Sequence, residues 1–473
     1  MDQPAPRHVV VVGGGISGLA AAWFLARDGG PRVRVTVLEG APLIGGKLRV
    51  SEVAGVPVDE GAESLLLRRP EAVELARAAG LGEELEDAAT TSASIWTRGR
   101  MRPIPSGTVM GVPADLRALG RAGILTAGEL ARIPADSWLP RTRIGDDVSV
   151  GRLVTRRMGR AVVDRLVEPL LGGVYAGRAD LLSLEATLPQ LAPYARADRS
   201  LLVAARRARE AQPASATGAV FGAPRGGVGR LPAAVARLSG ATVRTSATVR
   251  ELSRTPTGWA LTVGSTRNAE RIDADAVIIA VPPAAAARLL REHVAPAAAE
   301  LSVIRSASMA VLALAFPSTA FRRPPVGSGF LVPPVDGRVI KAATFSSKKW
   351  GWYADAAPAL TVVRVSVGRL DEETDLQRDD TELVELALAD LAEALGVTDP
   401  PIDARVSRWG GGLPQYGVGH LGRVARVRSA VAAHPGLAVA GAAYDGVGIA
   451  ACVATAERAA ADVLRQWGND NPW

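Results

Sequence analysis

The feature that most constrains the fold is a glycine-rich turn near the start of the chain. Residues 9–30 read VVVVGGGISGLAAAWFLARDGG, in which four valines run directly into three glycines and then into a segment of small residues. An uninterrupted apolar run is typical of a parallel strand that is buried on both faces. Gly13, Gly15 and Gly18 follow it with the spacing G-x-G-x-x-G. A strand, a tight turn and a helix in this order predict the first unit of a Rossmann-type nucleotide-binding domain.

Each of the three glycines in this motif is required for a different physical reason. Gly13 permits the tight turn, Gly15 allows the backbone to approach a pyrophosphate, and Gly18 allows the helix to pack closely on the strand. The helix continues over residues 19–27, and its first N–H groups would point at the phosphates. The next strand is expected over residues 33–38 and ends at Glu39, whose carboxylate is placed to accept hydrogen bonds from a ribose. The glycines alone indicate only a turn, but the strand, the helix and the acid together predict a dinucleotide site.

A second glycine turn follows Glu39 in the segment GAPLIGGKLRV. Gly45 and Gly46 allow another close approach of the backbone to a cofactor, and Lys47 can reach a phosphate. A plain NAD-binding domain does not need this extension. The extended motif resembles that of the large flavoprotein family that contains amine oxidases, phytoene desaturases and porphyrinogen oxidases. The resemblance implies that the cofactor is FAD rather than NAD.

The C-terminal segment LAVAGAAYDGVGIAACVATAERAAADVL repeats the order strand, glycine loop, helix. We expect a strand over 437–440, a turn at Gly441, a loop through Gly446 and Gly448, and a long helix from Ile449. The positive end of such a helix stabilises the negative charge that reduced flavin carries near N1 and O2, by ~0.3–2 kcal/mol. This segment is therefore predicted to meet the same cofactor as the N-terminal turn.

Further cofactor contacts follow from the resemblance. It implies that DEGAES, residues 59–64, is the loop that covers the flavin, that Val249 lends its backbone to the adenine, and that Trp409 lies beside the flavin. The full set of predicted cofactor-binding residues is Gly13, Gly14, Gly15, Ile16, Ser17, Gly18, Glu39, Gly40, Gly46, Lys47, Gly61, Ala62, Glu63, Ser64, Val249, Trp409, Gly441, Val447, Gly448 and Ile449.

Four longer segments make the resemblance more specific. They are EPLLGGVYAG (168–177), TFSSKKW (344–350), RWGGGLPQYGVGH (408–420) and YDGVGIAAC (444–452). Together they resemble the oxygen-dependent porphyrinogen oxidases of haem biosynthesis, over almost the whole chain. The resemblance implies oxidation of coproporphyrinogen III to coproporphyrin III, with protoporphyrinogen IX as the alternative substrate. An amine or carotenoid oxidoreductase on the same fold, and a non-catalytic carrier that keeps the nucleotide fold, remain open.

The implied chemistry removes six electrons from the macrocycle in three two-electron steps. Each step passes a hydride from a carbon bridge to flavin N5 while a pyrrole N–H loses its proton, and O2 reoxidises the flavin to give H2O2. Because the cofactor carries this chemistry, no catalytic residue of the protein is predicted. The chain has four histidines and one cysteine, and none forms a metal-binding pattern, so no metal is expected.

The substrate would carry four propionates, which suits a chain with a formal net charge of +7. Arg69 is the first candidate for a propionate partner, and Arg68 and Lys348 are weaker ones. Further substrate-binding candidates, at positions that match pocket walls of the family, are Leu65, Val174 and Tyr175.

A chain of 473 residues is too long for one hydrophobic core. We expect a mixed α/β fold with a Rossmann-type FAD-binding domain built from discontinuous segments, a sheet-containing substrate domain and a helical subdomain. The predicted domains are 1–68 with 222–290 and 430–473 for FAD, 69–95 with 185–221 and 291–429 for the substrate, and 96–184 for the helical subdomain.

Local patterns predict several elements within these domains. Ser149 would cap one helix with apolar positions over 150–167, and Pro169 with Gly172–Gly173 would close it. Single strands are expected over 51–58 and 277–281, and an amphipathic helix over 380–395. A loop is expected in part of 196–224, which is rich in small and charged residues.

Composition restricts the partners and the location. The arginines are scattered and no run of five or six basic residues occurs, so nucleic acid is not expected. Cys452 is the single cysteine, which excludes an internal disulfide and fits a reducing compartment. No signal peptide or spanning apolar run is evident. We therefore expect a cytoplasmic protein with at most peripheral membrane contact, whose product a ferrochelatase could take.

Overall fold

A parallel five-stranded sheet joins three distant parts of the chain. The computed structural model describes residues 5–211, 219–397 and 399–469. All neighbouring strands of this sheet are parallel. Their order is β12 (Thr242–Arg244), β2 (Val33–Leu38), β1 (Arg7–Val12), β16 (Ala276–Ile279) and β22 (Leu437–Val439). The predicted Rossmann-type sheet made from discontinuous segments is therefore confirmed.

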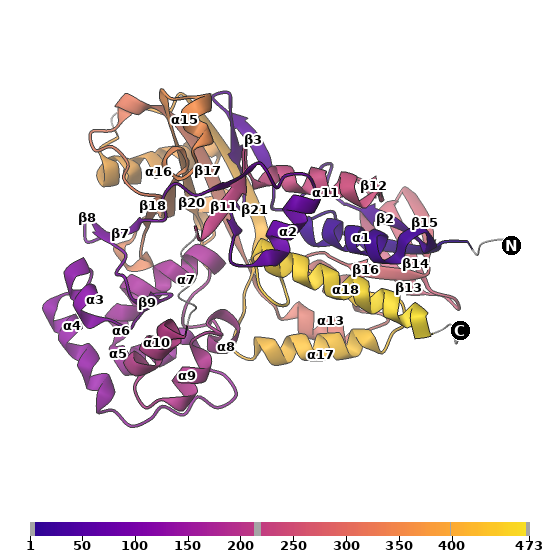
Figure 1. Cartoon of the computed structure of the whole chain (residues 1–473), viewed down its shortest axis with the longest axis horizontal. Coiled ribbons are helices and arrows are strands. Elements are labelled where there is room, and N and C mark those ends of the chain that lie inside the picture. The colour runs from indigo at the N-terminus through magenta and orange to yellow at the C-terminus, as the bar shows by residue number, and fades with distance from the viewer. Residues whose placement is uncertain (1–4, 212–218, 398, 470–473) are drawn as a thin grey trace.

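Strand β1 is buried on both faces, as its four valines predict. Val9 and Val11 belong to a core shared with one group of helices, and Val10 and Val12 belong to a core on the opposite face. The first core contains α1 (Ile16–Gly29), α11 (Leu231–Ser239) and α18 (Ile449–Asn469), of which α1 and α18 lie side by side (Figure 1). The second contains β13 (Val249–Arg254), β14 (Trp259–Ser265), α12 (Pro283–Leu290), α13 (Ala295–Ser302) and α17 (His420–Ala432).

The second large sheet has seven strands and is mixed. Only its β18–β7 pair is parallel among the described strands. Helix α16 (Asp380–Leu395) covers one face, which confirms the predicted amphipathic helix. The strand order is β21 (Asp403–Pro414), β17 (Ser306–Pro317), β20 (Leu360–Val367), β19 (Ile340–Phe345), β18 (Gly329–Leu331), β7 (Ala93–Thr97) and β8 (Arg100–Pro103).

A group of short helices forms a third part of the molecule, below the seven-stranded sheet in Figure 1. Several of them share one hydrophobic core, which includes residues from 95 to 208. They are α3 (Leu116–Ala122), α4 (Ala127–Arg132), α5 (Val150–Met158), α6 (Arg160–Val162), α7 (Glu168–Tyr175), α8 (Leu184–Thr187), α9 (Ala192–Ala197) and α10 (Leu201–Glu210). Residues 212–218, within the segment expected to be partly loop, lie outside the described residues.

The single helix predicted after Ser149 is wrong. Ser149 does cap α5, but the helix ends at Gly159, whose φ of +99° no helix interior accepts. The chain then resumes through α6 and a π-helix over Val163–Val167 into α7. Pro169 stands in the first turn of α7, where its missing N–H is tolerated, so it begins a helix rather than closing one.

The strand predicted over 51–58 is also wrong, because the segment forms a hairpin. Its strands are β3 (Val50–Val53) and β4 (Val56–Asp59). Ala54 and Gly55 have φ values of +50° and +76°, which is the two-residue turn that matches the twist of a hairpin.

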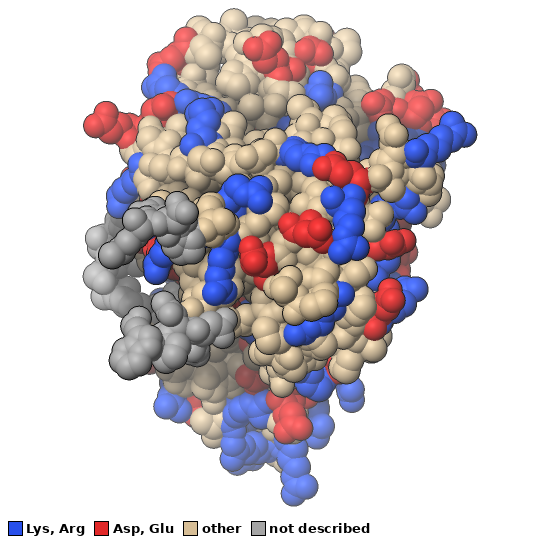
Figure 2. All heavy atoms as spheres, turned by 90° about the vertical axis from the view of Figure 1, so that its right-hand side faces the viewer, with Lys and Arg blue, Asp and Glu red and all other residues tan. Residues whose placement is uncertain are grey.

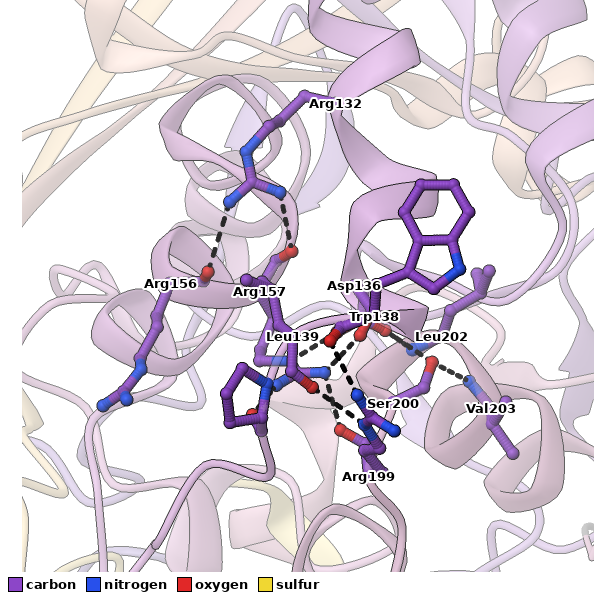
Figure 3. A network of polar contacts seen from close by, with 11 residues as sticks. Arg132, Asp136, Trp138, Leu139, Arg156, Arg157, Arg199, Ser200, Leu202 and Val203 are labelled. Carbon is purple, nitrogen blue, oxygen red and sulfur yellow. Dashed lines mark hydrogen bonds and ion pairs between the residues drawn. The ribbon is translucent and has the colours of Figure 1, made fainter.

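A buried ion pair links three helical elements of the helical part (Figure 3). The Arg157 guanidinium donates to a carboxylate oxygen and to the backbone carbonyl of Asp136. Asp136 also accepts from the Ser200 hydroxyl and from the Leu202 N–H at 2.9 Å. Both charged side chains are at most 2% exposed. These contacts fix α5, α10 and the 3₁₀ turn Ile133–Ser137 against one another.

In the view of Figure 2, acidic and basic side chains are interspersed over the middle of the face, and basic side chains gather along its lower edge. Within the described part of the chain, no helix is both long enough and apolar enough to cross a membrane.

Candidate functional site

Three glycine turns from distant parts of the chain meet at the carboxyl end of β1. Gly15 forms an isolated parallel bridge with Gly45. A Cβ atom placed on Gly46 would lie 3.3 Å from the Cα of Gly15, and one on Gly441 would lie 4.0 Å from Ser17 Oγ. The N-terminal turn, the 45–47 turn and the C-terminal loop therefore border one common site.

The glycines of this site fall into two groups, those packed tightly against protein and those that face open space. A Cβ on Gly13 would lie 2.5 Å from the Ala280 carbonyl oxygen, and one on Gly18 would lie 1.9 Å from the Gly13 oxygen, so both positions are closed by protein. At Gly15 and Gly448, no atom of the described residues comes within 4 Å of the added Cβ. Helix α1 begins after Gly15, and no side chain caps it among the described residues. Open space in front of uncapped helix amides fits a pyrophosphate.

Glu39 lies at the end of β2 and is held by two backbone amides. Its Oε2 accepts from the Gly14 N–H at 2.6 Å, and its Oε1 accepts from the Ala41 N–H at 2.7 Å. An ionised carboxylate has about four acceptor sites, so two donors leave capacity for ribose hydroxyls. The neighbouring Gly40 lies close to Thr248, whose Oγ1 would be 3.1 Å from an added Cβ. The fixed orientation of Glu39 suits the predicted ribose contact.

Lys47 projects toward the starts of α1 and α18. Burial lowers the pKa of Lys47, and the neighbouring Cys452 opposes this shift. Burial raises the pKa of the Cys452 thiol, against the effects of Ser17 and Lys47. The three side chains thus come together where the two helices begin. A bound phosphate would supply the counter-charge that a partly desolvated ammonium needs.

The loop over 59–64 is anchored by its carboxylates. Asp59 accepts from the N–H groups of Val228 at 3.0 Å and Gly229 at 2.8 Å. Burial raises the pKa of Asp59 to about 7 against these hydrogen bonds and the nearby Arg364. A Cβ on Gly61 would lie 2.0 Å from the Lys47 carbonyl oxygen, so the loop runs directly along the 45–47 turn.

Glu63 is an internal ion-pair partner rather than a free side chain. It pairs with the Lys349 ammonium and the Arg364 guanidinium, and Arg364 also donates to the Gly61 carbonyl. Burial opposes the ionisation of Glu63, but the two cations outweigh it and lower its pKa to about 2. The Glu63 carboxylate, the Gly61 carbonyl and the Ala62 N–H thus all have protein partners, and the contact of this loop with a cofactor stays a prediction.

The sequence analysis did not identify Lys349 or Arg364. Lys349 follows the exposed Lys348 directly, but it is buried. Arg364 interrupts the apolar strand LTVVRVSV of β20, and a charge inside such a strand is the one signal that could have indicated a buried partner.

Trp409 lies beside the same loop. Its indole N–H donates to the Glu60 carbonyl at 2.9 Å, and its ring would be 3.5 Å from a Cβ on Gly61. The guanidinium of Arg49 lies 5.3 Å from the ring centroid. The indole therefore sits between Arg49 and the loop predicted to cover the flavin.

The remaining predicted cofactor residues have varied surroundings. Ala62 is exposed, and its N–H donates to the Lys47 carbonyl at 3.3 Å; Ser64 is half-buried. Val249 begins β13 with its side chain in the core, and its carbonyl accepts from Arg288 at 3.3 Å. Val447 packs against the core of the helical part. Ile16 and Ile449 are the buried first residues of α1 and α18.

The substrate-binding candidates lie in two different cores and on the surface. Leu65 has no exposed area and belongs to the core of α1 and α18, whereas Tyr175 is buried in the core of the helical part. Val174 is exposed. Arg69 is also exposed and pairs with its neighbour Glu71 at 2.6 Å. Leu65 is thus a packing residue in this structure.

Aromatic residues that the sequence analysis did not select connect α7 to the C-terminal loop. The Tyr416 ring lies 5.6 Å from the Tyr175 ring and stacks on His420 at 3.9 Å, measured between centroids. Its hydroxyl donates to the Ala442 carbonyl at 2.6 Å. Burial lowers the pKa of His420 to about 4, so the stacked imidazole is neutral near pH 7. No cluster of three or more potential metal ligands occurs among the described residues.

Comparison with protein families gives a match over most of the chain. The model of the flavin containing amine oxidoreductases matches residues 16–464.

Curated relatives extend over almost the full length of the chain. The coproporphyrinogen III oxidase of Mycobacterium tuberculosis (strain H37Rv) is 41% identical, and the match covers 97% of this chain and 98% of the relative. The enzyme of the same name from Bacillus subtilis is 32% identical, with coverage of 97% and 98%. The protoporphyrinogen oxidase of Bos taurus is 28% identical, with coverage of 97% and 98%.

Solved structures agree with these matches. A crystal structure from Exiguobacterium sp. 255-15, provisionally named a protoporphyrinogen oxidase, has a TM-score of 0.85 and 32% identity, and the match covers 98% of this chain and 99% of that one. A putrescine oxidase variant has a TM-score of 0.67 at 18% identity, with coverage of 98% and 99%, and it shows the shared fold alone.

Proposed function

The chain belongs to the family of flavin-containing amine oxidoreductases, and on that premise we propose that it is an FAD-dependent coproporphyrinogen III oxidase. The observation that carries the proposal is the likeness to coproporphyrinogen III oxidases along nearly the entire chain. The convergence of three glycine turns supports it, because such a cradle suits a dinucleotide. Protoporphyrinogen IX is the alternative substrate, which the bovine relative favours.

The cradle supports FAD rather than a smaller flavin. The amides at the start of α1 and the Lys47 ammonium would hold the pyrophosphate, and the Glu39 carboxylate would hold the adenosine ribose. When bound, FAD supplies a ring that accepts a hydride at N5. The backbone of 61–64, the Trp409 indole and the start of α18 would border that ring.

The protein's own part is to bind, orient and exclude water. Trp409 and the 59–64 loop form one contiguous wall, which the Glu63 ion pairs hold against β20 and α14 (Ser346–Lys349). The N-terminus of α18 supplies positive potential for charge on the reduced ring. No acid–base residue is assigned, because the hydride acceptor belongs to the cofactor.

The remaining parts of the proposal concern the cellular setting. O2 serves as the electron acceptor and three H2O2 form for each coproporphyrin III. We propose a cytoplasmic location with at most peripheral membrane contact, from which a ferrochelatase could take the product. The scattered arginines of the sequence, without a run of five or six basic residues, support a partner other than nucleic acid.

A direct turnover assay tests the proposal. Purified protein is reconstituted with FAD and given coproporphyrinogen III, protoporphyrinogen IX and a panel of amines under air. We expect porphyrin fluorescence and H2O2 in a ratio of one to three, with coproporphyrinogen III giving the highest kcat/KM. A higher kcat/KM with protoporphyrinogen IX selects the alternative, and H2O2 from an amine alone overturns both. A protein that takes up no flavin overturns the oxidase proposal and leaves the non-catalytic carrier as the open alternative.

A further inference from the structure

Tyr416 is a buried side chain that reaches the C-terminal glycine loop, residues 441–448, from outside that loop. It lies shortly before α17 and is 1% exposed. Its hydroxyl donates to the Ala442 carbonyl at 2.6 Å. Burial raises the pKa of this hydroxyl and the Gly446 backbone opposes the shift, so Gly446 lies beside the same oxygen. One phenol oxygen thus contacts both halves of the loop.

The backbone around Tyr416 is fixed by the helical part. The Ser183 N–H, at the start of α8, donates to the Tyr416 carbonyl at 2.8 Å. The Gly419 N–H donates to the Asp147 carboxylate at 2.7 Å, and the same carboxylate accepts from the Ser183 hydroxyl at 2.6 Å. The backbone of Tyr416 is therefore attached to the helical part, while its hydroxyl contacts a loop of the cofactor cradle.

Two ring contacts restrict the direction of the Tyr416 hydroxyl. The Tyr416 ring stacks on His420 with 3.9 Å between the centroids, and it lies 5.6 Å from the Tyr175 ring. His420 has no exposed area, so the stack is enclosed by protein. Aromatic contacts of this kind favour particular ring orientations, and they therefore hold the hydroxyl toward the loop.

Other anchors of the loop lie at its start and at the surface. The Gly441 N–H donates to Thr455 Oγ1 at 3.0 Å. Asp445 pairs with Arg428 of α17 at 2.6 Å, but both side chains are partly exposed, and such pairs contribute little to stability. The buried hydroxyl of Tyr416 is thus placed to fix the middle of the loop, whose last residues lead into α18.

We propose that Tyr416 is a positioning residue for the flavin: its hydroxyl fixes the loop 441–448 so that the N-terminus of α18 faces the charged part of the reduced ring. Uptake of two electrons and one proton by the bound ring leaves one negative charge, which a helix N-terminus stabilises. A loop that is free to move away weakens this stabilisation for the reduced form and leaves the oxidised form nearly unaffected. The inference rests on the flavin part of the proposed function and not on the choice of porphyrinogen.

The midpoint potential of the bound flavin tests the inference. Tyr416→Phe keeps the ring and removes the hydroxyl alone. We expect the affinity for reduced FAD relative to oxidised FAD to fall about three- to tenfold, which lowers the midpoint potential by about 15–30 mV for a two-electron couple. Anaerobic reduction of the FAD-loaded protein beside a reference dye measures this shift.

Tyr353→Phe is the matched control. Tyr353 is also buried, and its hydroxyl donates to the Pro57 carbonyl of β4 at 2.9 Å, outside the loop 441–448. Both variants should lose a similar amount of Tm, because each loses one buried hydrogen bond, but the control should keep the midpoint potential. An unchanged potential in Tyr416→Phe overturns the inference, and so does an equal fall in both variants.

A crystal structure of the unaltered, FAD-loaded protein gives a second readout that needs no variant. We expect the Tyr416 hydroxyl on the Ala442 carbonyl and the first amides of α18 at the flavin ring. An Ala442 carbonyl bonded elsewhere, or an α18 that starts away from the ring, overturns the inference even if Tyr416→Phe fails to fold. Failure of the unaltered protein to bind FAD overturns the proposed function as well. FAD binding with the expected potentials but without porphyrinogen turnover overturns the oxidase proposal alone.

Discussion

At the scale of single residues, Glu63 depends on contacts that are remote in sequence. Its two cationic partners lie 286 and 301 positions away along the chain. Glycine spacing identified the cradle because each glycine acts through its own backbone. No such local rule applies to Glu63. Its place in the DEGAES segment predicted a contact with the cofactor, whereas in the structure its carboxylate pairs with two cationic side chains of the protein. Pairing across such separations cannot be predicted from one sequence.

Glu63→Gln should destabilise the protein strongly, because it leaves Lys349 and Arg364 buried without an anion. We expect a loss of about 3–5 kcal/mol in the free energy of unfolding, measured by denaturant titration. Glu71→Gln breaks the exposed pair with Arg69 and should cost less than about 1 kcal/mol. Equal losses in unfolding free energy in the two variants would show that the buried Glu63 ion pairs stabilise the protein no more than the exposed pair does.

The same carboxylate should make stability depend on pH in acid. Its pKa falls from an ordinary 4.5 to about 2 on folding, so its contribution is complete above pH 4.5 and is lost as the pH falls from 4.5 toward 2. A shift of this size corresponds to about 3 kcal/mol. The difference in unfolding free energy between the unaltered protein and Glu63→Gln should shrink over this interval. A difference that stays constant from pH 6 to pH 3 would contradict the prediction.

Lys47→Met should weaken flavin binding without weakening the empty protein. The substitution removes a partly desolvated ammonium and one charge-assisted hydrogen bond to a phosphate, so we expect FAD affinity to fall about 10–100-fold. Fluorescence titration of the apoprotein measures this. Lys348→Met serves as the control, because that lysine is exposed. Unchanged affinity in Lys47→Met would remove the residue from the cofactor site.

At the scale of helices and strands, the sequence patterns predicted an element correctly where all the residues that determine it lie within that element. The strand β2 over Val33–Leu38 and the helix α16 over Asp380–Leu395 form over the same residues that the sequence analysis expected. The prediction of one helix over 150–167 failed because the chain breaks at Gly159. The spacing of apolar residues is the same for one continuous helix as for α5, α6 and the π-helix in succession. The periodicity of apolar residues indicates which face of a helix is buried, but it does not indicate whether the helix is continuous.

Gly159 marks that break, and its replacement tests it. Gly159→Ala forces an alanine to a φ of +99° and should cost about 1–2 kcal/mol. Gly128→Ala, inside α4 with no described atom within 4 Å of the added Cβ, should stabilise the protein by up to about 1 kcal/mol. Circular dichroism during chemical unfolding gives both values. A neutral Gly159→Ala would mean that the chain can run through this point as one helix.

At the scale of the whole molecule, the sequence predicted which distant segments of the chain meet, whereas the residues of the substrate pocket stay a prediction. Two glycine motifs at opposite ends predicted that both ends meet, and Gly441 lies beside Ser17. The pocket walls were carried over from the family, and they scatter between two cores and the surface. The domain limits stay a prediction, although α9 and α10 share the core of α5.

Cofactor binding should therefore protect both ends of the chain together. We expect FAD to slow amide hydrogen exchange in the first turns of α1 and α18 in parallel, while the ion-paired junction of α5 and α10 in Figure 3 changes little. Exchange followed by mass spectrometry measures each segment. Protection confined to α1 would place α18 outside the cofactor site.

The order of strands in the parallel sheet also determines when the site can form during synthesis. β22 pairs with β16 and immediately precedes the glycine loop that leads into α18. A nascent chain still lacking residue 439 has neither the last strand nor the second helix of the cradle. Flavin loading must consequently wait until nearly all of the described chain has left the ribosome, and earlier fragments carry an unfinished sheet edge that is open to misassembly.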